Sequence, residues 1–301
     1  MNKIVIATRE SQLALWQANF VKAQLEASYP ELEVELLGIT TKGDRWLNQP
    51  LREIGGKGLF INELEDALLA GKADLAVHSM KDVPAKLTQG FTLGAIGFRD
   101  DVRDCFVSRG DTNFKNLAIG AKIGSSSLRR VTQILADRPD LEVLPIRGNV
   151  NTRLAKLDSG EFDAIILAAA GLNRLGFENR ITSFFDPEQM LPAAGQGALG
   201  IECCTHRTDL ISLLGQLNDS LVSACVIAER KVSEVLGADC SSPVAAYAVS
   251  ADGQIRLRGL VASLDGQEIV RAEFCGVEPQ EVGTVVANSL LDLGAERILA
   301  V

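Results

Sequence analysis

The stretch Lys122–Arg130, which reads KIGSSSLRR, shows the pattern that decides the fold. A short apolar run ends at Gly124, a serine-rich turn follows, and a helical pattern begins near Ser127 and continues to about Asp137. A strand that leads through such a turn into a helix is typical of α/β sheets. The carboxyl end of the strand meets the amino terminus of the helix there, and open α/β sheets bind ligands at this edge.

The same alternation of short β-rich runs and helical patterns extends in both directions through the first two thirds of the chain. The expected strands are Lys3–Thr8, Leu32–Ile39, Asp74–His78, Leu141–Ile146 and Ala164–Ala168. The expected helices are Gln12–Ala27, Leu59–Ala70 and Val150–Leu157. This alternation predicts parallel or mixed sheets that are covered by helices.

The alternation of short strands and helices ends at about residue 219. A long helix is expected at Leu221–Leu236 and a last one at about Glu281–Leu293, with three strands between them at Val244–Val249, Ile255–Ala262 and Glu268–Phe274. Asp-Gly pairs at 252–253 and 265–266 separate the strands and indicate hairpin turns. We therefore expect an α+β unit with a small antiparallel sheet, and three domains: 1–97 with 196–217, then 98–195, then 218–301.

The composition is that of a folded globular protein. Of 301 residues, 47% are hydrophobic and 23% are charged, and the net charge is -9. This charge argues against non-specific binding to nucleic acid or anionic membranes. The apolar run Ala164–Leu172 is far shorter than the ~20 residues of a spanning helix, and the N-terminus does not resemble a signal peptide. We expect a cytoplasmic protein.

The six cysteines give no sign of a metal site, because they form no CxxC pair and no zinc-ligand spacing with the two histidines. Cys105, Cys203, Cys225 and Cys275 lie in or beside apolar runs, and we expect them in the core. Cys240 lies in a loop that reads GADCSSP. A loop thiol is a candidate reactive group, although an incidental loop cysteine fits the pattern equally well.

Basic residues recur where expected strands end and helices begin. They are Arg9, Lys57, Lys81, Arg129, Arg130, Arg147 and Arg153. Arginines bind carboxylates in a bidentate manner, and helix amino termini offer free N–H groups. The repetition predicts a cleft for a ligand with several carboxylates or phosphates, whereas any single one of these residues fits a solvated surface charge as well.

Two further features leave their alternatives open. Asp82 in a basic cleft would stabilise a cation or relay protons, but aspartate is also a common turn cap. The glycine-rich residues 55–58, GGKG, lack the Walker pattern and fit a flexible loop as well as a ligand contact.

Six motifs together resemble the porphobilinogen deaminase family. They are TRESQLALWQA at 8–18, GGKGLF at 55–60, AVHSMKDVP at 76–84, SSLRR at 126–130, RGNVNTRL at 147–154 and LPAAGQGA at 191–198. The resemblance extends from about residue 4 to residue 300, with the motifs in the family's order.

The resemblance implies two α/β domains similar to periplasmic binding proteins and a C-terminal α+β domain. It also implies a transferase, hydroxymethylbilane synthase, of tetrapyrrole (haem) biosynthesis. A dipyrromethane cofactor is joined to the protein through a cysteine thioether. Four porphobilinogen molecules each lose ammonia and condense onto it, and hydrolysis releases hydroxymethylbilane. A monomer is implied as well.

The resemblance assigns roles to individual residues. Asp82 is the catalytic carboxylate, and Cys240 carries the cofactor. The other cofactor-binding residues are Lys81, Asp82, Ser126, Ser127, Arg129, Arg130 and Arg147. The substrate-binding residues are Arg9, Ser11, Lys57, Phe60, Arg147, Asn149, Arg153, Arg174 and Gln196. We expect these side chains and Cys240 to converge on one cleft.

The chain departs from the family pattern beside the cofactor cysteine. Ala238 and Asp239 replace two small residues, and Ser242 replaces an apolar one. Asp239 places a negative charge next to the thiol, which disfavours the thiolate. A binding module with the same two-domain fold is the alternative function. The missing signal-peptide pattern and the third domain with Cys240 argue against it.

Overall fold

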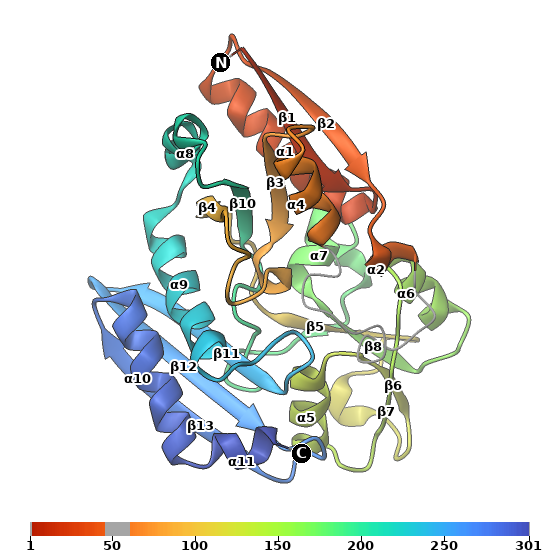
Figure 1. Ribbon diagram of the computed structural model, residues 1–301. Coiled ribbons are helices and arrows are strands. Elements are labelled where there is room, and N and C mark those ends of the chain that lie inside the picture. Colours follow the sequence, from red (N-terminus) through yellow and green to blue (C-terminus); the bar gives the residue numbers. More distant parts are fainter. Residues whose placement is uncertain (1, 46–60, 301) are drawn as a thin grey trace. The chain divides into compact units, whose positions relative to one another are not determined.

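The structure is a computed structural model that describes residues 2–45 and 61–300. The chain forms two compact units (Figure 1). The first comprises Met1–Arg99 and Ala198–Ser223, and the second comprises Asp100–Gly197 and Ala224–Val301. The chain therefore leaves the first unit, builds part of the second, returns, and then completes the second.

The first unit is built on a five-stranded sheet in the order β2-β1-β3-β10-β4. The strands are β1 (Lys3–Arg9), β2 (Glu33–Ile39), β3 (Leu75–Ser79), β4 (Phe91–Gly97) and β10 (Leu199–Cys204). β1 is parallel to β2 and β3, whereas β10 is antiparallel to β3 and β4. The helical elements are α1 (Gln12–Ser28), α2 (Lys42–Arg45), α4 (Asn62–Leu69), α8 (Thr208–Leu214) and the 3-10 turns η1 (Met80–Asp82) and η4 (Gly215–Leu217).

Apolar side chains at helical and alternating spacing hold this unit together. Val21 and Leu25 of α1 pack into one buried cluster with Ile4 and Ile6 of β1. Ser11 begins α1, and its Oγ accepts a hydrogen bond from the Ala14 N–H at 3.3 Å. An N-cap of this kind stabilises a helix by about 1 kcal/mol. It also fixes the turn between Arg9 and the helix.

The second unit contains a sheet with the same plan, in the order β7-β6-β8-β5-β9. Its strands are β5 (Asp104–Ser108), β6 (Lys122–Gly124), β7 (Glu142–Leu144), β8 (Ala164–Ala168) and β9 (Ser183–Phe184). Here β6 is parallel to β7 and β8, and β5 is antiparallel to β8. The helical elements are α5 (Leu128–Asp137), α6 (Val150–Asp158), α7 (Ala169–Arg174), η2 (Phe114–Asn116) and η3 (Glu178–Arg180).

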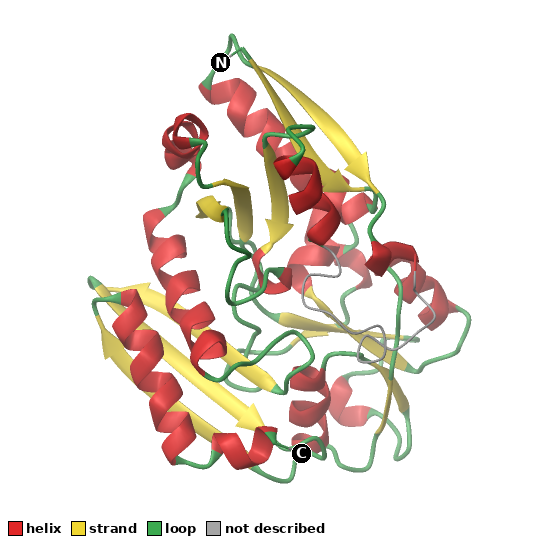
Figure 2. Cartoon of the chain, viewed as in Figure 1, coloured by secondary structure: helices red, strands yellow, loops and turns green. Residues whose placement is uncertain are grey.

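An antiparallel sheet of three strands, β11-β12-β13, completes the second unit (Figure 2). The strands are β11 (Val244–Ala251), β12 (Gln254–Ala262) and β13 (Ile269–Gly276). The helices α9 (Ser220–Val235), α10 (Pro279–Asp292) and α11 (Ala295–Leu299) share a core cluster with this sheet. The predicted class, α/β with a C-terminal α+β part, is confirmed, and the three-domain division stays a prediction.

The expectation that Cys275 lies in the core is wrong, because its side chain is exposed. Cys275 pairs with Arg256 across the edge strand β13, two residues from Glu273. Alternate residues of a strand share a face, so Cys275 lies on the side that carries the Arg256–Glu273 ion pair. Among the described residues, no single helix is long and apolar enough to cross a membrane, although α8 with η4 and α9 satisfies that criterion as a bent pair.

Candidate active site

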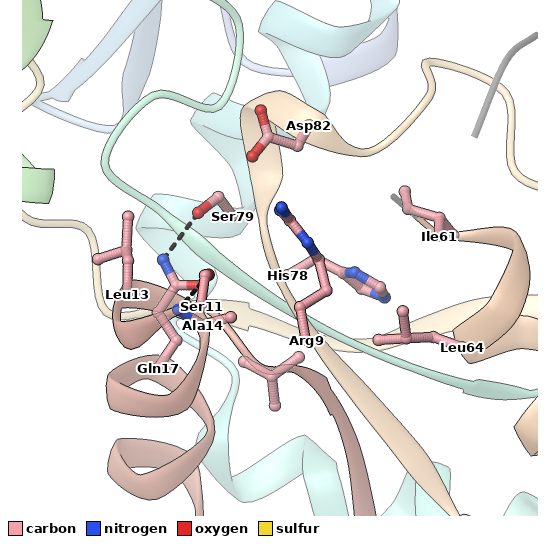
Figure 3. A pocket seen from close by; sticks show the side chains of 11 residues that line it. Arg9, Ser11, Leu13, Ala14, Gln17, Ile61, Leu64, His78, Ser79 and Asp82 are labelled. Atoms are coloured by element: carbon pink, nitrogen blue, oxygen red, sulfur yellow. Dashed lines mark hydrogen bonds between the residues drawn. The ribbon is translucent and has the colours of Figure 1, made fainter. Parts of the chain in front are cut away.

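The first group of predicted site residues lies at the carboxyl ends of two neighbouring strands. β1 and β3 are parallel and paired, so Arg9 at the end of β1 lies near the segment that follows β3. Ser79 is the last residue of β3, and the segment that follows it carries Asp82. A pocket opens at this place (Figure 3). Its lining residues are Arg9, Ser11, Leu13, Ala14, Gln17, Ile61, Leu64, Val77, His78, Ser79 and Asp82.

Arg9 is held by an aspartate that the sequence did not single out. Its Nε lies 3.1 Å from Asp44 Oδ2, and its Nη2 donates to Oδ1 of the same carboxylate. Thr41 Oγ1 also donates to Asp44 at 2.8 Å. Burial alone would raise the pKa of Asp44, but the hydrogen bond and charge of Arg9 outweigh it and lower the pKa. The guanidinium is therefore oriented before any ligand binds.

Asp82 ends the 3-10 turn η1, and its side chain is exposed. The Val83 N–H donates to the Met80 carbonyl at 3.2 Å, which closes the turn. Below Asp82, Gln17 Nε2 donates to Ser79 Oγ at 2.7 Å and links α1 to the end of β3 (Figure 3). Lys81, next to Asp82, is half-buried. The predicted substrate-binding residues Lys57 and Phe60 lie outside the described residues.

The second group centres on a buried ion cluster. Asp104 is 0% exposed, at the start of β5. It accepts hydrogen bonds from Arg129 Nη1 at 2.7 Å, Arg130 Nε at 2.9 Å and Gln196 Nε2 at 3.0 Å. We call these four residues the Asp104 cluster. The predicted cofactor-binding arginines are thus paired with a carboxylate of the protein itself.

The charges of the Asp104 cluster shift each other's protonation. Burial opposes the charged form of Asp104, but Arg129 and Arg130 overcome it and hold the pKa of the carboxyl well below its usual range. Burial lowers the pKa of Arg129. Two guanidinium groups face one carboxylate, so the cluster keeps one unit of positive charge. Arg129 Nε is buried without a hydrogen-bond partner among the described residues.

Backbone contacts anchor the motif at 191–198 beside this cluster. Leu191 accepts from Arg129 Nη1 at 2.8 Å, and its N–H donates to Gln133 Oε1 at 2.8 Å. The Gly195 N–H donates to Glu229 Oε2 at 2.7 Å, and the buried Glu229 also accepts from the Ala248 N–H at 2.8 Å. Glu229 therefore ties this motif to β11 of the C-terminal sheet.

Cys240 is exposed in the loop between α9 and β11. Arg147 follows β7 and is half-buried, and burial lowers its pKa while the negative charge of a Cys240 thiolate raises it. A cation within electrostatic reach of a thiol favours the thiolate. The predicted cofactor cysteine and one predicted cofactor-binding arginine are thus within electrostatic reach of each other.

The departure at Asp239 has a structural role in this loop. Asp239 Oδ1 accepts from the Ser241 N–H at 2.9 Å, from Ser241 Oγ at 2.6 Å and from Ser242 Oγ at 3.2 Å. The Asp239 N–H donates in return to Ser242 Oγ at 3.0 Å. These bonds close a turn around Cys240, and the two unusual residues, Asp239 and Ser242, bond to each other in it.

The remaining predicted residues of the second unit lie in or just before the helices α5, α6 and α7. Ser126 Oγ donates to the Ile146 carbonyl at 2.7 Å, and Ser127 is the N-cap residue of α5. Asn149 caps α6 by accepting from the Thr152 N–H at 3.0 Å, and Arg153 Nε donates to the Gly148 carbonyl at 2.8 Å. Arg174 is buried and donates from Nη2 to the Gly197 carbonyl at 2.6 Å.

The two groups belong to different units, so their convergence on one cleft stays a prediction. Sequence reasoning missed Asp44, Asp104 and Glu229. One feature of the sequence indicates a buried role for Asp104: it is an acidic residue directly before the apolar run Cys105–Val107. A carboxylate at the head of a buried strand needs a partner, and buried arginines supply it.

Comparisons with known proteins identify the family. The model described as "Porphobilinogen deaminase, dipyromethane cofactor binding domain" matches residues 4–212, and "Porphobilinogen deaminase, C-terminal domain" matches residues 223–292. The porphobilinogen deaminase of Chromobacterium violaceum is 53% identical over 302 residues, which cover 100% of this chain and 98% of that protein. That of Neisseria meningitidis serogroup B is 51% identical, with 99% and 96% covered.

Two solved structures are similar at low identity. The periplasmic aliphatic sulphonate binding protein SsuA from Escherichia coli has a TM-score of 0.41 and 12% identity, and the match covers 78% of this chain and 70% of that one. An arginine-specific periplasmic binding protein from Salmonella typhimurium has a TM-score of 0.44 and 13% identity, with 74% and 94% covered.

Proposed function

Because this chain belongs to the porphobilinogen deaminase family, we propose that it condenses four porphobilinogen molecules, with loss of one ammonia each, and releases hydroxymethylbilane by hydrolysis. This is a transferase reaction of haem biosynthesis. The observation that carries the proposal is the exposed Cys240 thiol within electrostatic reach of Arg147. An exposed thiol near a cation is suited to form the thioether that holds a cofactor.

The residues of the second unit fit a dipyrromethane. The cofactor would be held through Cys240 Sγ, and its free pyrrole α-carbon would supply the carbon onto which the chain grows. Each pyrrole brings an acetate and a propionate. Arg147 and the net positive charge of the Asp104 cluster favour these anions, and the buried Nε of Arg129 is a donor without a partner among the described residues.

The remaining cofactor and substrate residues act as anion-binding or orienting groups. Arginines pair with carboxylates, and serine, asparagine and glutamine side chains contribute hydrogen bonds. The proposed set is Arg9, Ser11, Lys57, Phe60, Lys81, Ser126, Ser127, Arg130, Asn149, Arg153, Arg174 and Gln196.

Asp82 is the proposed catalytic carboxylate. When ammonia leaves porphobilinogen, the C–N electron pair departs with nitrogen and a cationic electrophile remains. An ionised carboxylate that accepts from the pyrrole N–H stabilises this charge as it develops. Arg9 lines the same pocket as Asp82, and its pairing with Asp44 holds the guanidinium in place there.

Intact mass spectrometry tests the attachment site. Wild type, Cys240→Ala and the control Cys275→Ala are incubated with porphobilinogen and denatured, and their masses are measured. Both cysteines are exposed, so the control also removes an exposed thiol. Wild type and the control are expected to carry covalent pyrrole, and Cys240→Ala to have the bare polypeptide mass. Covalent pyrrole on Cys240→Ala, or none on wild type, would contradict the proposal.

We further propose that the enzyme acts as a monomer in the cytoplasm, as the family resemblance implies. Light scattering coupled to size exclusion measures the molar mass directly. The mass of one chain at working concentrations is expected, and a multiple of that mass would refute the monomer.

A further inference from the structure

A buried imidazole–carboxylate pair lies beside the Asp82 pocket. His78 lines that pocket, and its Nε2 lies 3.0 Å from Oε2 of Glu202 on β10. The His78 side chain is 6% exposed and that of Glu202 is 1% exposed. Glu202 Oε1 is buried without a hydrogen-bond partner among the described residues. A carboxylate so enclosed is costly unless a positive or proton-donating group faces it.

Other charged groups around this pair come from each neighbouring element. Glu65 of α4 is buried and within electrostatic reach of both His78 and Glu202. Burial raises the pKa of Glu65, and the charge of Glu202 raises it further, although a hydrogen bond with Thr88 and the charge of His78 lower it. Arg9 and Asp82 face His78 from the pocket. Glu65 is thus a second buried carboxyl group near the imidazole.

We propose that Glu202 is a positioning residue for the catalytic pocket, and that it acts by fixing the tautomer and ring orientation of His78. An ionised carboxylate only accepts hydrogen bonds, so the Nε2 proton of His78 is committed to Glu202. In the neutral imidazole, Nδ1 is then the nitrogen without a proton. Any proton that His78 accepts would then bind at Nδ1.

The reaction supplies a reason for such a group. In each condensation the C–N bond of porphobilinogen breaks and its electron pair leaves on nitrogen. A C–C bond forms, and the attacking pyrrole carbon loses a proton, which balances the proton that the leaving amine gains. A side chain that accepts the proton from carbon and returns it to the leaving amine serves both steps. This inference rests on the proposed function.

Nitrogen-15 NMR of histidine-labelled protein tests the positioning, because the chain contains two histidines. His206 is exposed, so His206→Gln assigns the spectrum and is expected to leave activity unchanged. In wild type we expect His78 as the Nε2–H tautomer with a slowly exchanging proton. In Glu202→Gln the amide both donates and accepts, so the single tautomer is lost.

Kinetics separate positioning from a structural role. For Glu202→Gln we expect kcat to fall about tenfold with KM within about twofold, and the pH profile of kcat to shift. Glu65→Gln is the matched control: it removes the other buried carboxyl of the group and is expected to keep the tautomer and the profile. Should Glu202→Gln not fold, His78→Gln is measured instead, with the same loss of kcat expected.

An Nδ1–H tautomer in wild type, or a pH profile of Glu202→Gln that coincides with wild type, would overturn the inference. So would a His78→Gln enzyme with wild-type kcat. The NMR result needs no turnover, so it stands apart from the proposed function, which fails if wild type releases no hydroxymethylbilane.

Discussion

Asp104→Asn is expected to destabilise the second unit strongly, because Asp104 is the only carboxylate in the Asp104 cluster as the structure describes it. The substitution keeps the size of the side chain but replaces a negative oxygen with an N–H₂ group. Arg129 Nη1 at 2.7 Å and Arg130 Nε at 2.9 Å then lose the negative charge that they face. The new amide group also places N–H donors opposite the N–H donors of an arginine. Removing one partner of a buried ion pair costs about 3–5 kcal/mol.

The thermal effect follows from the size of the unit. For a domain of 150–250 residues, 1 kcal/mol corresponds to about 2–4 °C in Tm, so a decrease of roughly 6–20 °C is expected. Asp158→Asn is the control, since it makes the same chemical change in the same unit. Asp158 pairs with Arg180 at 2.5 Å, but its side chain is 57% exposed. A surface pair of this kind contributes less than about 1 kcal/mol.

The assay is urea unfolding of cofactor-free protein, with the free energy of unfolding compared among wild type, Asp104→Asn and Asp158→Asn. The pKa of Asp104 is lowered in the folded state, so the stability it contributes is present above its unfolded pKa of about 4 and is lost as the pH falls toward the folded pKa. The difference between wild type and Asp104→Asn is therefore expected to be constant from pH 5 to 8 and to shrink below pH 4. A loss under 1 kcal/mol at pH 7 would refute the reasoning.

Three further predictions concern single positions. Asp82→Asn is expected to keep the wild-type free energy of unfolding, because the side chain is exposed, and to lose about 10²–10³ in kcat; a loss of only a few-fold in the deaminase assay would remove Asp82 from catalysis. Gly266→Ala is expected to cost about 2–5 kcal/mol in urea unfolding, since Gly266 has φ +71 and a Cβ would lie 2.4 Å from the Thr132 carbonyl. Gly253→Ala, with φ +73 and open space, should cost only about 1–2 kcal/mol, and equal losses would contradict the role of the contact. Asp239→Ala is expected to slow pyrrole attachment to cofactor-free protein severalfold, whereas Asp239→Asn, which keeps the acceptor and removes the charge, should match or exceed wild type; attachment is followed by intact mass, and a faster Asp239→Ala would show that the turn is dispensable.

Local patterns predicted most elements, because their signals lie within a few residues of one another. The Asp-Gly pair at 252–253 predicted the hairpin between β11 and β12. Both residues have positive φ, 52° and 73°, as the favoured two-residue hairpin turn requires. The glycine and serine turn after β6 likewise leads into α5 as expected.

The order of strands in the sheets could not be predicted in the same way. β10 lies between β3 and β4, although more than a hundred residues separate the end of β4 from the start of β10. β5 lies between β8 and β9 by an equivalent insertion. Which distant strands pair depends on how the helices cover both faces of each sheet. A short segment of the sequence does not contain that information. The face on which Cys275 lies depends on the same register.

The arginines show what this limit means for the site. Sequence position placed Arg129 and Arg130 at a ligand-binding edge, but only the pairing of β5 with β8 explains why Asp104 meets them. That meeting changes their chemistry, because one carboxylate offsets one of two cations and leaves Arg129 Nε without a partner among the described residues. The hydrogen bonds to Asp104 stabilise the cluster without a ligand. Two cations still share one negative charge, and Arg129 Nε has no acceptor among the described residues. In the proposed function, a carboxylate of the bound pyrrole chain would supply both a second negative charge and that acceptor.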